Sequence, residues 1–74
     1  MYRIKQEKIS EIKEYRTSLY SEKTGLNANY LSSILNATMN CSEIIAKAVL
    51  SVKFNISLYD VRLNDLLKEY FEEE

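Results

Sequence analysis

Only one residue in this chain is a strong interruption of helical structure, because its 74 residues include a single glycine, Gly25, and no proline. Glycine and proline are the residues that most often end or break helices, so a chain with so few of them favours helical segments. Apolar residues recur at helical spacing on both sides of Gly25. We therefore expect a mostly helical fold with a sharp turn at this glycine.

The stretch Thr17–Asn36 around the glycine has the pattern of a helix-turn-helix. Its apolar side chains fall where two short crossing helices bury them, at Tyr20, Leu26, Leu31 and Ile34. Small Ser21 permits close approach of the two helices, and Gly25 can adopt the positive φ that ends a helix. This pattern makes nucleic-acid binding the first functional hypothesis.

Helix boundaries in this stretch follow from the turn residues. Gly25–Asn27 forms the predicted turn, and Asn27 is a natural N-cap because its side-chain oxygen can accept from backbone N–H groups two or three residues on. We expect helices over about 17–24 and about 28–36. Residues 37–40 then form a loop.

Further helices are predicted on either side. An apolar stripe predicts a first helix over about residues 2–15, and Ser42 or Cys41 opens a fourth helix that ends near Phe54–Asn55. The predicted buried face of this fourth helix is formed by Ile44, Ile45, Ala48, Val49 and Val52. The expected fold is all-α, a compact domain of four or five helices spanning residues 1–74.

The last third of the sequence leaves two interpretations open. Val52, Phe54, Ile56 and Leu58 alternate with polar residues, which allows a small hairpin over residues 52–63. Ser57 with Asp60 three residues later resembles a capping box, and a helical stripe of apolar residues follows it. We favour a helix, followed by the acidic end at residues 69–74.

Composition excludes several classes of protein. With 46% hydrophobic and 28% charged residues, the chain is typical of an ordered globular domain. A single cysteine, Cys41, and no histidine leave no internal disulfide, no Cys/His zinc site and no imidazole base, so we expect no cofactor, no metal and no enzyme activity. No segment has the apolar run of a signal peptide or a membrane span, which favours the cytoplasm.

By its residues, the segment SEKTGLNANYLSSILN resembles the second and third helices of the Cro/CI-type (XRE) helix-turn-helix family, in particular small phage and prophage regulators of Gram-positive bacteria. Cys41-Ser42 followed by IIAKAV, and the ending KEYFEE, are similar to segments of that phage group. The resemblance covers residues 16–50 well and the two ends loosely. It implies transcriptional regulation, binding to double-stranded DNA and often a homodimer.

The resemblance also implies which residues face DNA. The major-groove surface of the third helix corresponds to Asn27, Ala28, Asn29, Ser32, Ser33 and Asn36. Asparagine can bond bidentately to adenine, serine can bond to several base edges, and alanine can contact a thymine methyl group. Contacts to phosphate are expected from Arg16, Thr17, Ser18, Lys23, Tyr30 and Lys47.

Charge is where the chain departs from that family. The usual Gly-Lys-Arg-like stretch after the third helix is replaced by Ala37–Asn40, and the only charged residue between Lys23 and Lys47 is Glu43. Residues 1–23 carry a net charge of +2, residues 59–74 carry −4, and the whole chain carries −1. Affinity for DNA depends on cations that displace counterions from phosphates, so a small number of contacts predicts weak binding, which a homodimer partly offsets by doubling the contacts.

Two further expectations concern partners. A dimer or partner interface is expected at apolar residues in excess of a small core, namely Tyr59, Leu66, Leu67, Tyr70 and Phe71. The missing loop cations and the acidic end support a second hypothesis, in which a phage-encoded inhibitor or adaptor, for example of anti-CRISPR or host-takeover type, uses the same scaffold to bind a host protein.

Overall fold

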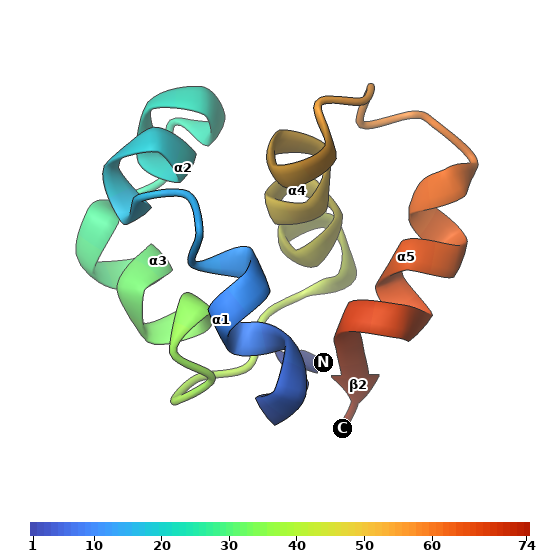
Figure 1. Cartoon of the computed structure of the whole chain (residues 1–74), viewed down its shortest axis with the longest axis horizontal. Helices are drawn as coiled ribbons and strands as arrows, with labels where there is room; N and C mark the ends of the chain where they lie inside the picture. Colours follow the sequence, from blue (N-terminus) through green and yellow to red (C-terminus); the bar gives the residue numbers. More distant parts are fainter.

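All 74 residues are described by the computed structural model, which has five α-helices and a small antiparallel sheet (Figure 1). The elements in chain order are β1 (Tyr2–Ile4), a 3-10 turn η1 (Gln6–Lys8), α1 (Ile9–Ile12), α2 (Thr17–Thr24), α3 (Ala28–Leu35), α4 (Glu43–Phe54), α5 (Arg62–Tyr70) and β2 (Phe71–Glu73). The chain is therefore mostly helical, as predicted, but it is not all-α.

Helices α2, α3 and α4 begin and end close to the predicted residues. Gly25 ends α2 with φ at 76°, in the left-handed region where glycine meets no Cβ penalty. Asn27 Oδ1 caps α3 by accepting from the amides of Asn29 at 2.8 Å and Tyr30 at 3.2 Å. Ser42 caps α4, and Asn55 ends it with φ at 54°.

The core lies between these helices and the sheet. Tyr20 on α2 is fully buried, and its hydroxyl donates to the carbonyl of Ile12 at 2.6 Å. Each of the longer helices adds buried apolar side chains at helical spacing, which are Leu31, Ile34 and Leu35 from α3, Ala46, Val49 and Leu50 from α4, and Leu63, Leu67 and Tyr70 from α5. Of the four predicted residues of the helix pair, Leu26 is only half-buried.

The predicted first helix over residues 2–15 is wrong at both ends. Residues 2–4 form β1, and helical structure runs only from Gln6 to Ile12. β1 has hydrogen-bonding partners on both sides, since it pairs with β2 in the register Arg3 to Glu72 and forms an isolated bridge to Cys41. Ile4 is buried there, so pairing with distant residues outweighs the helical spacing of the local sequence.

The small hairpin that the sequence left open over residues 52–63 is absent, and the favoured helix is present as α5. Residues 52–54 belong to the last turn of α4, and the chain then makes turns until α5 begins at Arg62. The strand in this part of the chain is β2, which follows α5. Phe71 is thus a buried strand residue and not part of a helical stripe.

Ile44 is a further correction, because 64% of it is exposed although we expected it on the buried face of α4. The buried residues of that helix are Ala46, Val49 and Leu50. Residues two positions apart in a helix are separated by about 200° around its axis, so Ile44 points away from the side occupied by Ala46.

Across the whole fold, no helix combines the length and apolar character needed to cross a membrane.

Candidate nucleic-acid interface

Helix α3 has one apolar face and one polar face. Leu31, Ile34 and Leu35 are buried, whereas Ala28 and Asn29 are exposed and Ser32 and Ser33 are partly exposed. None of the exposed side chains of α3 is charged. Figure 1 shows α2 and α3 together at one side of the molecule, with α5 on the opposite side.

Short hydrogen bonds hold α2, the turn and α3 together as one unit. The Ser21 hydroxyl donates to the Leu26 carbonyl at 2.6 Å, so this small residue does more than permit close packing. Thr24 Oγ1 donates to the carbonyl of Tyr20 at 2.7 Å and accepts from the amide of Leu26 at 3.2 Å. Together with the Asn27 cap of α3, these side chains fix the turn on both of its flanks, which keeps the direction of α3 well defined.

The predicted base-reading residues differ in how free their side chains are. Asn27 Oδ1 is occupied by capping, and Asn36 Nδ2 donates to the Ser32 carbonyl at 2.8 Å and to Ser32 Oγ at 3.4 Å. The Ser33 hydroxyl donates weakly to the Asn29 carbonyl at 3.4 Å. The Asn29 amide side chain makes no hydrogen bond within the chain, so both its donor and its acceptor are free for a ligand.

The predicted phosphate contacts fall into two groups. Arg16, Ser18 and Lys23 are exposed on or beside α2, with half-buried Thr17 between the first two. Tyr30 is half-buried on α3 and packs against the core. These residues belong to the same helix pair as the polar face of α3 or lie directly beside it in the sequence.

Lys47 does not join them. It lies on α4, where Nζ is 3.0 Å from a carboxylate oxygen of Glu43 and 3.0 Å from Asn64 Oδ1 on α5. Its charge is balanced within this other part of the molecule. The same contacts lower the pKa of Glu43, because Lys47 hydrogen-bonds to the charged form of this carboxyl.

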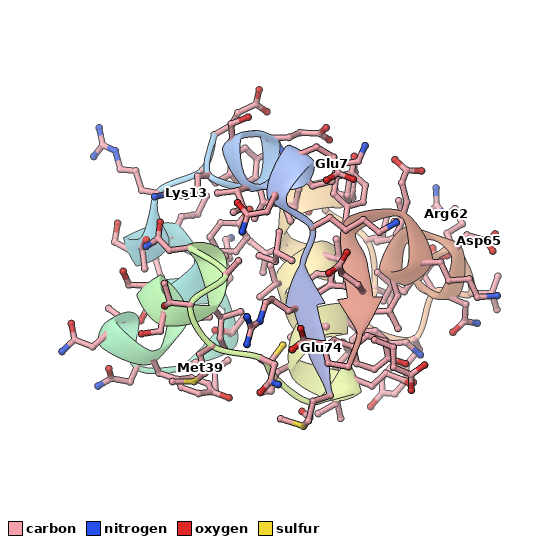
Figure 2. All side chains as sticks on the ribbon, turned by 90° about the horizontal axis from the view of Figure 1, so that it is seen from below. Glu7, Lys13, Met39, Arg62, Asp65 and Glu74 are labelled. Atoms are coloured by element: carbon pink, nitrogen blue, oxygen red, sulfur yellow. The ribbon has the colours of Figure 1, made fainter.

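Ion pairing separates the cations of the chain into two sets. Five of them are paired with carboxylates, in Arg3–Glu74, Lys8–Glu69, Lys47–Glu43, Lys53–Glu14 and Arg62–Asp60. The other five are in none of these pairs, and of these Lys13, Arg16 and Lys23 lie in residues 13–42 with α2 and α3, whereas Lys5 and Lys68 do not. Figure 2 shows Lys13 on the α3 side, while Arg62 and Asp65 lie at the opposite end. The unpaired charge beside α3 is thus mainly positive.

The acidic end folds back onto β1. Residues 71–73 pair with residues 2–4, and a Glu74 carboxylate oxygen lies 3.3 Å from Arg3 Nε. The same oxygen accepts from Asn40 Nδ2 at 3.2 Å, so Glu74 reaches the loop after α3 but its charge is compensated by Arg3. Glu72 and Glu73 remain exposed on β2.

Burial governs the chemistry of the one cysteine. Cys41 is fully buried, and desolvation raises the pKa of its thiol to about 11. A neutral, buried thiol is a poor nucleophile. Nowhere do three or more acidic or cysteine side chains converge as ligands of a metal ion would.

Most residues of the predicted partner interface belong to this chain's own core. Leu67, Tyr70 and Phe71 are buried and Leu66 is half-buried, so the excess of apolar residues is absorbed by the fold. Tyr59 is different, since 92% of it is exposed. It shares a surface hollow with Ile44 and Leu58, at the start of α4 and in the turns before α5.

No family model, curated protein or solved structure matches this chain. The class that its structure defines is a small, mostly helical protein with an uncharged polar helix face flanked by unpaired cations. Sequence reasoning did not predict the contact between Lys13 and Asn36, which lie 23 positions apart. No local pattern signals a contact over that separation.

Proposed function

We propose that this protein is a sequence-specific regulator of transcription that places α3 in the major groove of double-stranded DNA. The observation that carries the proposal is the polar face of α3, which is exposed, uncharged and held in a fixed direction by the turn. The sequence resemblance to Cro/CI-type regulators supports the same conclusion. A major groove accommodates one such helix, with its side chains against the base edges.

Asn29 is the principal base-reading residue in this proposal. Its free amide can donate through Nδ2 to adenine N7 and accept at Oδ1 from the adenine N6 amino group, a bidentate contact that contributes about 1–3 kcal/mol of discrimination. Ala28 next to it is small enough to meet a thymine methyl group, and Ser32 lies one turn further along the exposed side. Asn27, Ser33 and Asn36 border this surface.

Arg16 and Lys23 supply the contacts to phosphate, together with the hydroxyls of Thr17 and Ser18 and the flanking Tyr30. So few cations give weak binding at physiological salt, because each phosphate contact contributes through counterion release. A homodimer on a palindromic site doubles these contacts without changing the chain. We therefore expect two copies on one operator.

Fluorescence anisotropy with the DNA upstream of the protein's own coding sequence tests the proposal, at about 50 and 200 mM salt. We expect saturable binding that exceeds binding to a scrambled duplex and weakens with salt. Asn29→Ala should relax the preference at one base pair, while the matched variant Asn64→Ala, on the exposed side of α5, leaves binding unchanged. Equal affinity for both duplexes would overturn sequence-specific recognition.

A second candidate function, binding of a host protein as an inhibitor or adaptor, is favoured by one observation. Tyr59, Val61 and Ile44 are 92%, 79% and 64% exposed, which is unusual for large apolar side chains. Tyrosine is also enriched among the residues that dominate protein interfaces. If this function holds, Tyr59→Ala abolishes capture of a defined partner and Asn29→Ala does not.

A further inference from the structure

Lys13 lies at the C-terminal end of α3 although it follows α1 in the sequence. Its Nζ is 2.5 Å from Oδ1 of Asn36, the residue that ends α3. Figure 2 shows Lys13 projecting on the side of the molecule that carries α2 and α3. The pair joins two segments that are 23 residues apart.

The Asn36 side chain is oriented by the last turn of α3. Its Nδ2 donates to the Ser32 carbonyl at 2.8 Å, which leaves Oδ1 as the acceptor for Lys13. The C-terminal end of a helix carries partial negative charge, and this further favours a cation at that place. Lys13 is therefore held by a neutral amide and a helix end instead of a carboxylate.

The charge of Lys13 remains available to a ligand. Lys13 is exposed and is in none of the ion pairs of the chain, and only one of the three N–H donors of its ammonium group is used by Asn36. The loop that follows α3, Ala37–Asn40, contains no cation of its own. Lys13 thus supplies a positive charge where the local sequence supplies none.

We infer that Lys13 binds a DNA phosphate at the C-terminal end of α3, and that Asn36 is a positioning residue for Lys13 and not a base-reading residue. This inference rests on the proposed function. With Arg16 directly before α2 and Lys23 on α2, it gives the polar face of α3 three flanking cations. Phosphate contacts set the orientation of a helix in the groove, so Lys13 fixes the far end of α3.

The test is the salt dependence of binding to a mixed-sequence duplex of about 20 base pairs, for the full chain and for Lys13→Gln. Glutamine retains a donor for Asn36 and removes the charge. We expect the slope of log affinity against log salt to become shallower by about 0.9 for each bound copy. Lys68→Gln, an exposed unpaired lysine on α5, is the matched control and keeps the original slope.

Two outcomes overturn the inference in distinguishable ways. If the unmodified protein binds the duplex and Lys13→Gln has the same slope, Lys13 only caps α3 and the proposed function stands. If the unmodified protein binds neither this duplex nor the DNA upstream of its own coding sequence at about 50 mM salt, the proposed function falls and the inference falls with it.

Asn36→Ala tests the positioning role separately. We expect it to weaken binding to all duplexes alike, and to have no further effect when Lys13→Gln is already present, because both changes remove the same contact. Loss of preference at one base pair instead would make Asn36 a base-reading residue. Equal additive losses would show that the two residues act independently.

Discussion

Residues 13–42 and the remainder of the chain differ in how many of their charged side chains form ion pairs. Residues 13–42, which contain α2 and α3, include five charged side chains, and only Glu14 takes part in an ion pair. The remainder of the chain holds both partners of the other four ion pairs. Residues 13–42 therefore carry mainly unpaired cations, whereas the remainder of the chain combines most of the ion pairs with unpaired charges of both signs, among them Lys5, Lys68, Glu72 and Glu73.

This difference separates the residues that stabilise the fold from those available to a ligand. Exposed ion pairs contribute little to stability, so the remainder of the chain is not strongly stabilised by its charges. Stability comes from the buried side chains shared by all five helices. The polar face of α3 makes few internal contacts, so its residues can be changed with small effects on folding.

The largest expected effect contrasts the two faces of α3. Leu31→Ala removes a fully buried side chain and should lower the free energy of unfolding by about 2–5 kcal/mol. Asn29→Ala, on the exposed face of the same helix, should change it by less than about 0.5 kcal/mol. Urea denaturation of both variants measures this. A large loss for Asn29→Ala would show that its side chain serves folding.

A smaller effect is expected at the buried hydroxyl beneath α2. Tyr20→Phe removes the bond to the Ile12 carbonyl and should cost about 1–3 kcal/mol, because that carbonyl loses a buried donor. Tyr59→Phe alters a hydroxyl on an exposed ring in the other part of the chain and serves as the control. Thermal unfolding followed by circular dichroism compares them, and equal midpoints would argue that the bond contributes nothing.

Helices α2 and α4 each end at a residue with left-handed backbone conformation, and substitutions at these two positions should differ in how much they destabilise the fold. Gly25→Ala should destabilise by about 1–2 kcal/mol through backbone conformation alone, since an added Cβ meets no atom within 4 Å. At the end of α4, Asn55→Gly should change stability by only about 0.5 kcal/mol, because both residues tolerate positive φ. Denaturant titration tests both. If Gly25→Ala were neutral, the turn would not need glycine.

The smallest effect concerns a single ion pair outside residues 13–42, between Arg62 and Asp60. The side-chain hydrogen bond from Arg62 to Asp60, with a further bond from the Arg62 amide, lowers the pKa of Asp60 from 3.8 to about 2. The stabilising contribution is therefore complete above pH 3.8 and is lost as the pH falls through about 2. NMR titration of the Asp60 carboxyl measures the pKa, and Arg62→Gln should raise it.

Sequence reasoning predicted best where structure depends on local signals. Gly25, Asn27, Ser42 and Asn55 each satisfy backbone groups within a few residues, so the ends of α2, α3 and α4 could be predicted from short patterns. The sheet could not be predicted this way. Residues 2–4 fit a helical stripe, and their pairing with residues 71–73 depends on contacts between distant segments.

Parts of the candidate site were beyond prediction for the same reason. The polar face of α3 follows from helical spacing, but the contact of Lys13 with Asn36 Oδ1 joins segments 23 residues apart. Lys47 was expected near DNA because it is a cation on the next helix. Its pairing with Glu43 is an i,i+4 contact within α4 that spacing could have indicated, whereas its contact with Asn64 is set by how α4 packs on α5.

The pairing of β1 with β2 also determines how the molecule responds to force. Met1 and Glu74 lie side by side, with the Glu74 amide donating to the Met1 carbonyl at 2.7 Å, and the paired residues continue inward to Ile4 and Phe71. Tension applied at residues 1 and 74 loads these hydrogen bonds one after another, starting at the chain ends. The sheet should therefore peel open at low force, before the helical core is stretched.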